Sequence, residues 1–113
     1  MSYLLFRATC GAVLLFLLAL VWSGPLQAQD AGTLFKTKCS ACHAADGSGS
    51  GAMGKQLGVK DLRSDDVQKQ TDAQLIAIIT NGMGQKMPAY KGKLTDAEIM
   101  GLVGYLRDLA KKK

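Results

Sequence analysis

Cys39-Ser40-Ala41-Cys42-His43 is the stretch that decides the fold and the chemistry of this 113-residue chain. Two thiols three positions apart, followed directly by a histidine, form the attachment sequence for c-type haem. Each thiol can add across one vinyl group of the porphyrin, and the imidazole can then bind the iron from one face. The motif predicts one covalently bound haem c, held by Cys39 and Cys42, with His43 as an axial ligand.

The first 28 residues differ in composition from the rest of the chain. Arg7 is followed by an uncharged run of 15 residues, 8–22, which is shorter than the roughly 20 residues that a membrane span requires. The segment ends at Ala28, a small residue that a signal peptidase accepts. We predict that residues 1–28 are a secretory signal peptide and that residues 29–113 are exported, for example to the periplasm. An uncleaved membrane anchor is the alternative.

Cleavage would change both the cysteine content and the charge. Cys10 would leave with the signal, so only Cys39 and Cys42 would remain. Two cysteines cannot build the disulfide framework of a small secreted domain, whereas a covalently held haem can form the centre of its core. Loss of Arg7 lowers the net charge from +5 to +4. A moderate positive charge of this size indicates either an acidic protein partner or solubility alone. The lysines are not interleaved with aromatic residues, so we predict no nucleic-acid partner.

The pattern after the signal predicts an all-α domain with three main helices. The first runs from about Asp30, a suitable N-cap, to Ala41. Capping boxes begin the second helix at Thr71 and the third at Thr95. Residues 44–60 contain five glycines and are predicted to form a loop around the cofactor.

Two glycines interrupt the apolar pattern of the third helix. Gly101 and Gly104 each weaken a helix by about 1 kcal/mol relative to alanine. We predict that they are tolerated because another helix approaches closely there.

The second axial ligand of the iron can be narrowed by elimination. His43 is the only histidine, and both remaining cysteines belong to the attachment motif. The candidates are therefore the methionines of the domain, Met53, Met83, Met87 and Met100. Met100 lies inside the third helix, where we predict core packing, and Met53 is only 10 residues past His43. Met87 is favoured because Pro88 restricts its backbone, and Met83, flanked by glycine, is the alternative.

These features together resemble a class I c-type cytochrome of the small monohaem type. The resemblance covers nearly all of residues 30–113 and rests on Gly32, Phe35, the CSACH motif, the segment Met87-Pro88-Ala89-Tyr90, and Tyr105 with Leu106. It implies a small cytochrome c fold of three main helices and glycine-rich loops wrapped around one haem. It also implies that Met87 is the sixth ligand and that Gly32 and Phe35 pack against Tyr105.

The function that the resemblance implies is electron transfer, not enzymatic catalysis. A soluble monomer would cycle between Fe(II) and Fe(III) while passing electrons between redox proteins, and would meet membranes only through partner complexes. Lys86, Lys91 and Lys93 flank the Met87 segment and are predicted to steer acidic docking surfaces; a solvated loop without a docking role is the alternative. The alternatives are haem-based catalysis or gas-ligand binding, a membrane-tethered subunit of a larger complex, and a haem-free dithiol protein.

One departure from the family concerns the other ring nitrogen of His43. Many members have a proline after the attachment motif, near a carbonyl that accepts this N–H, but this sequence has only Pro25 and Pro88. We expect the acceptor near Gln56-Leu57 instead. Hydrogen bonds of this kind tune a bound metal, so the reduction potential depends on this contact.

Overall fold

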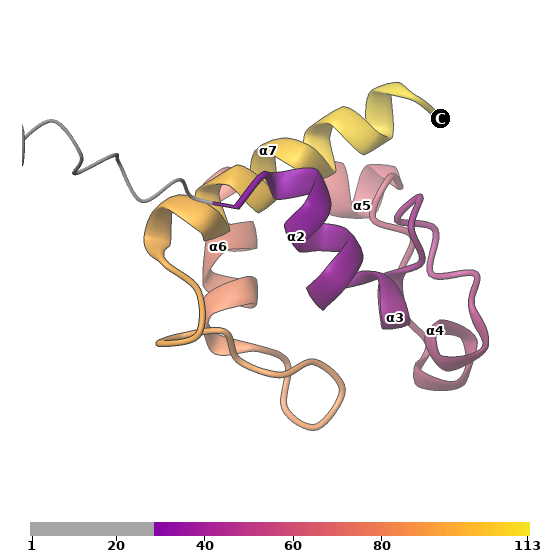
Figure 1. The fold of residues 1–113 in the computed structure, drawn as a ribbon. Helices are drawn as coiled ribbons and strands as arrows, with labels where there is room; N and C mark the ends of the chain where they lie inside the picture. Colours follow the sequence, from indigo (N-terminus) through magenta and orange to yellow (C-terminus); the bar gives the residue numbers. More distant parts are fainter. Residues whose placement is uncertain (1–28) are drawn as a thin grey trace, which may run out of the picture.

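A computed structural model describes residues 29–113, and the predicted signal peptide lies outside this part of the chain. Figure 1 shows the six helices, which are α2 (Ala31–Lys38), α3 (Ser40–His43), α4 (Ala52–Leu57), α5 (Asp65–Gln68), α6 (Asp72–Asn81) and α7 (Asp96–Lys111). Residues 29–113 contain no strand, which agrees with the predicted all-α class. No helix within these residues is long and apolar enough to cross a membrane.

The starts of the three main helices are those that the sequence predicts. The Asp30 side chain accepts a hydrogen bond from the Thr33 backbone N–H at 3.1 Å and caps α2. Thr71 and Thr95 each form a complete capping box, with Gln74 and Glu98 as the respective partners. Each cap satisfies backbone donors that the first turn of a helix leaves free, which stabilises it by about 1 kcal/mol.

The connections between these helices differ from the prediction in three places. The predicted first helix does not run unbroken to Ala41, because α2 ends at Lys38 and α3 begins at Ser40, with Cys39 between them. The glycine-rich region contains the short helix α4, and α5 follows it. Gly54 lies within α4 and is buried, and a Cβ there would overlap the carbonyl oxygens of Cys42 and Gly49. Tertiary contact therefore orders a segment whose composition is typical of a loop.

The core lies where α7 packs against both α2 and α6, as Figure 1 shows. Its buried side chains are Leu34, Phe35, Val67, Leu75, Ile79, Ile99, Leu102, Val103, Leu106 and Leu109. The rings of Phe35 and Tyr105 lie 5.3 Å apart, centroid to centroid, at 45°. A Cβ on Gly32 would lie 3.3 Å from the Tyr105 ring, so glycine allows α2 to approach α7. The predicted packing of Gly32, Phe35 and Tyr105 is confirmed.

Two predictions about α7 were wrong. A Cβ on Gly104 would meet open space, and one on Gly101 would make only an ordinary 3.7 Å contact with Ala31. Met100 is 61% exposed and does not belong to the core. The helical period accounts for Met100, because about 100° per residue turns it away from the buried stripe that contains Ile99 and Val103.

Candidate haem site

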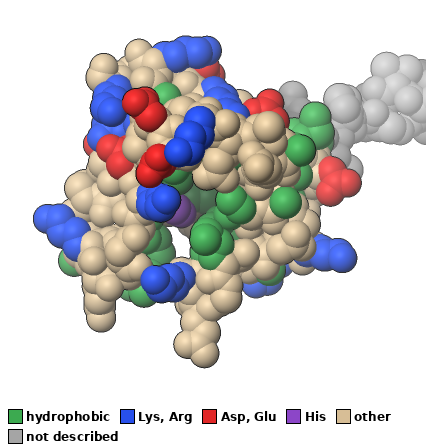
Figure 2. Space-filling model, turned by 180° about the vertical axis from the view of Figure 1, so that it is seen from behind, with side chains coloured by type: hydrophobic (Ala, Val, Ile, Leu, Met, Phe, Trp, Pro, Cys, Tyr) green, Lys and Arg blue, Asp and Glu red, His purple; other side chains and the backbone are tan. Residues whose placement is uncertain are grey.

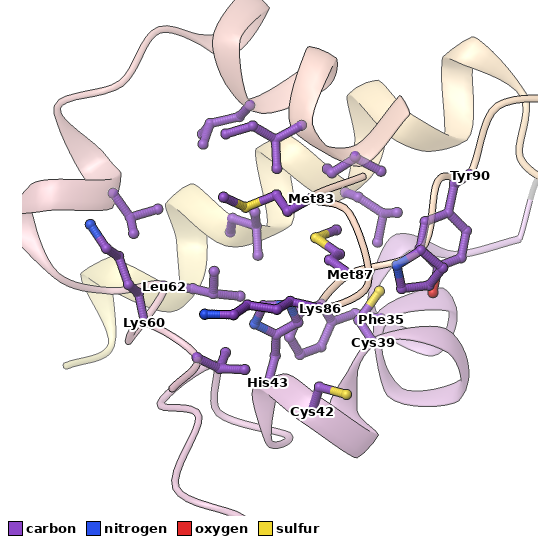
Figure 3. Close-up of a pocket in the computed structure, with 18 of the residues that line it drawn as sticks. Phe35, Cys39, Cys42, His43, Lys60, Leu62, Met83, Lys86, Met87 and Tyr90 are labelled. Carbon is purple, nitrogen blue, oxygen red and sulfur yellow. The ribbon is translucent and has the colours of Figure 1, made fainter. Parts of the chain in front are cut away.

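A cavity of about 580 Å³ opens between the helices and is lined mainly by apolar side chains. Its walls come from all six helices, from the segment after α4 and from the segment between α6 and α7. Figure 2 shows a histidine side chain in a hollow that is bordered by hydrophobic and basic side chains, and Figure 3 labels ten of the residues that line the cavity. A mostly apolar pocket with a few convergent polar groups is typical of a cofactor site.

The two thiols of the attachment motif lie on the same side of the cavity. Cys39 occupies the junction of α2 and α3, and Cys42 lies on α3. Both are half-buried and line the cavity. Burial, with a smaller contribution from Cys42, raises the pKa of Cys39 to about 11. Because reactive dithiol proteins need a lowered thiol pKa, this environment argues against the haem-free dithiol alternative.

The His43 side chain lines the cavity. Its Nδ1 is buried and has no hydrogen-bond partner among the described residues. Burial also lowers the pKa of His43, so the imidazole stays neutral, as a metal ligand must be. Because Nδ1 has no partner, the hydrogen bond that we predicted from His43 to an acceptor near Gln56-Leu57 is absent from the structure. Such an acceptor is hard to predict from sequence, since any backbone carbonyl can serve.

The two candidate methionines both line the cavity but differ in burial. In Figure 3, Met83 and Met87 lie across the cavity from His43 and Cys42. Met87 is half-buried and packs against the core, whereas Met83 is 60% exposed. Met53 and Met100 do not line the cavity. Of the four candidate methionines, only the two that the sequence favours, Met83 and Met87, line the cavity. Met87 is the more buried of the two.

The segment that carries Met87 is a closed loop. The Met83 N–H donates to the Met87 carbonyl at 2.9 Å, and the Tyr90 N–H donates to the Ile79 carbonyl at 3.1 Å. Gly82 permits this closure, because a Cβ there would lie 2.5 Å from the Met87 carbonyl oxygen. The loop is therefore held against the end of α6, and its Met87 side chain lines the cavity.

Three lysines lie around the cavity, namely Lys38, Lys60 and Lys86, and Figure 2 shows basic side chains near the opening. Of the lysines that the sequence singled out, only Lys86 lines the cavity, whereas Lys91 and Lys93 do not. Sequence reasoning missed Lys38 and Lys60, because only the fold brings α2 and the segment after α4 to the same opening.

The residues present fit one covalently attached haem. Two thiols and a neutral imidazole lie beside an apolar cavity, and a thioether lies across it. Within residues 29–113 there is no cluster of three or more His, Cys, Asp or Glu residues that could hold a bare metal ion. Two thiols, an imidazole and a thioether around an apolar cavity suit an iron carried by a porphyrin, and the fold and site define a haem protein of the c type.

Comparison with known proteins agrees with this class. Residues 26–106 match the family described as "Cytochrome C oxidase, cbb3-type, subunit III". Cytochrome c6 of Leptolyngbya boryana is 37% identical over 84 residues, which cover 72% of this chain and 91% of that protein. The subunit CcoP of the cbb3-type cytochrome c oxidase of Azospirillum brasilense is 35% identical, but the match covers only 28% of it.

A solved structure shares the fold. The KustC0563 c-type cytochrome superposes with a TM-score of 0.66 at 31% identity, over 71% of this chain and 96% of that one. The chain belongs to the c-type cytochromes, as a monohaem member of class I with the small all-α cytochrome c fold. It carries one covalently bound haem c and transfers electrons to and from redox proteins; it is an electron carrier and not an enzyme.

Proposed function

We propose that Cys39 and Cys42 hold the haem through thioether bonds and that His43 and Met87 are the axial ligands of its iron. The observation that supports this most strongly is the placement of two thiols and an imidazole on one side of an apolar cavity, with a half-buried thioether across it. The bound haem supplies a reversible one-electron couple between Fe(II) and Fe(III). Methionine ligation raises its potential relative to ligation by two histidines.

The chain contributes to electron transfer by excluding water from the haem. Phe35, Leu75, Ile79, Leu102 and Leu106 are buried core residues that also line the cavity. An apolar wall disfavours the more highly charged oxidised centre and so raises the potential further. The neutral His43 imidazole and the uncharged Met87 thioether add no charge of their own.

The visible spectrum of the matured protein tests the ligand assignment. Met87→Ala should remove the far-red sulfur-to-iron band of the oxidised protein and lower the reduction potential. Met83→Ala is the matched control from the same loop and should keep the band, because its side chain is largely exposed. Loss of the band in Met83→Ala alone would transfer the assignment to Met83.

We also propose that the cavity opening docks acidic surfaces of redox partners. Lys38, Lys60 and Lys86 surround it, and only Lys60 has a carboxylate nearby, with its ammonium 4.0 Å from Asp66. Clustered charge of one sign speeds encounter with an oppositely charged partner, and salt weakens this effect.

Transfer rates measured against ionic strength test the docking proposal. Lys38→Glu and Lys86→Glu should slow transfer from an acidic donor at low salt and flatten the salt dependence. Lys112→Glu makes the same charge change at the exposed C-terminus and should have a smaller effect. Equal effects of the three substitutions would show that net charge, and not this surface, controls the rate.

We propose export of a monomer after cleavage before Gln29. The apolar run of residues 8–22 and the small residue at Ala28 support this, as does similarity to several proteins named cytochrome c6. Cell fractionation and N-terminal sequencing test it, and gel filtration tests the monomer. The match to the cbb3-type subunit family supports a second candidate, a tethered haem subunit of an oxidase. An intact N-terminus and co-purification with membranes would favour that candidate.

A further inference from the structure

Tyr90 connects the Met87 loop to the helix that carries the first thiol. Its hydroxyl donates a hydrogen bond to the backbone carbonyl of Lys38 at 3.0 Å, across 52 positions of sequence. Lys38 is the last residue of α2, and Cys39 follows directly. Burial raises the pKa of Tyr90, so the hydroxyl remains a donor at neutral pH.

The Lys38 carbonyl is free because the helix is interrupted at Cys39. In an unbroken α-helix this carbonyl would accept the N–H of the residue four positions on, which is Cys42. The Cys42 N–H instead donates to the Cys39 carbonyl at 3.3 Å. The last carbonyls of a helix need outside partners, and the Tyr90 hydroxyl supplies one here.

The same residue is fixed from the other side by its backbone. The Tyr90 N–H donates to the Ile79 carbonyl at 3.1 Å, and the next N–H, of Lys91, donates to the Thr80 carbonyl at 3.0 Å. Tyr90 thus joins α6 to the α2–α3 junction. Met87 lies three positions earlier, and Pro88 stiffens the connection between them.

We propose that Tyr90 is a positioning residue, whose hydroxyl holds the Met87 loop against the α2–α3 junction and so keeps the thioether within reach of the iron. This inference rests on the proposed ligation by Met87. A foreign ligand can take the sixth position only when the thioether leaves, and we infer that the Met87 loop then moves away from α2, which breaks the bond between Tyr90 and Lys38. The hydroxyl therefore opposes ligand exchange, whereas a phenylalanine ring in the same place would pack but could not donate.

Imidazole binding to the oxidised holoprotein tests this role, with the sulfur-to-iron band as the readout. Tyr90→Phe should bind imidazole about two- to tenfold more tightly than the wild type, the change expected for one lost neutral hydrogen bond. Tyr105→Phe also removes a tyrosine hydroxyl, one with no hydrogen bond within residues 29–113, and should not change the affinity. Replacing Tyr90 with 4-aminophenylalanine keeps a donor on the same ring and should restore the wild-type affinity.

The possible results distinguish a failure of this inference from a failure of the proposed ligation by Met87. If Met87→Ala loses the band but Tyr90→Phe binds imidazole with the wild-type affinity, the ligation stands and the role of Tyr90 is refuted. If Met87→Ala keeps the band, the ligation itself fails. If Tyr90→Phe yields no holoprotein, the 4-aminophenylalanine variant decides: wild-type yield and affinity support the hydrogen bond, and a failure to mature refutes it.

Discussion

Gly82 is the position at which one added methyl group should most disturb the loop of Met87. Its backbone has φ 71° and ψ −172°, a region that essentially only glycine adopts. A Cβ there would lie 2.5 Å from the Met87 carbonyl oxygen, 2.7 Å from the Ala89 nitrogen and 2.8 Å from the Pro88 carbonyl carbon. All three neighbours are backbone atoms, so relief requires the loop to open.

The expected cost of Gly82→Ala has two parts. The backbone conformation costs alanine about 1–3 kcal/mol. Overlap of the methyl group with packed backbone costs roughly another 1–3 kcal/mol. The sum of about 2–6 kcal/mol is a large part of the 5–15 kcal/mol that typically stabilises a domain. The protein can relieve part of this cost by releasing the Met87 segment. The substitution should therefore weaken the bond between Met87 and the iron as well as lower the free energy of unfolding.

Denaturant unfolding of the holoprotein, followed together with the sulfur-to-iron band, measures both effects. Gly84→Ala is the matched control, because Gly84 lies in the same loop with φ 61° but a Cβ there would meet nothing within 4 Å. It should cost only about 1–2 kcal/mol and keep the band. Equal losses of stability in the two variants, or an unchanged band in Gly82→Ala, would refute the reasoning.

Three other substitutions have clear expected outcomes. Ala44→Gly should raise the free energy of unfolding by about 1 kcal/mol, since Ala44 has φ 62° and ψ 158°, and a midpoint shift in denaturant would measure it. Gly54→Ala should lower it by at least about 2 kcal/mol in the same assay, because its Cβ would overlap the Cys42 and Gly49 carbonyls. Met100→Gln should change neither stability, beyond about 0.5 kcal/mol, nor the sulfur-to-iron band, because Met100 is 61% exposed.

Sequence predicts those parts of the fold that local chemistry decides. The capping boxes at Thr71 and Thr95 are complete within four residues, so their donors and acceptors can be paired without knowing the fold. The attachment motif is also local, and its spacing on a helix end places Cys39, Cys42 and His43 at one cavity. The apolar stripe of α7 predicts its buried face for the same reason.

The remaining features depend on contacts between distant segments. The interruption at Cys39 leaves no sign in the sequence, and the Lys38 carbonyl that it frees is used by Tyr90, 52 positions away. The glycines of residues 44–60 favour a loop by composition, yet Gly54 lies inside a helix because backbone from Cys42 and Gly49 packs on it. Propensity is a weak prior that such tertiary contacts override.

Several side chains belong both to the core and to the haem site of this protein. Phe35, Leu75 and Ile79 are buried core residues that also line the cavity, as are Leu102 and Leu106 of α7. In a domain this small, the apolar face of the cofactor replaces the second layer that larger domains build from protein alone. The side chains that stabilise the fold therefore also set the polarity around the iron. Stability and reduction potential are consequently coupled at each of these positions, whereas at Met100, which is exposed and caps no helix, we expect neither to depend on the side chain.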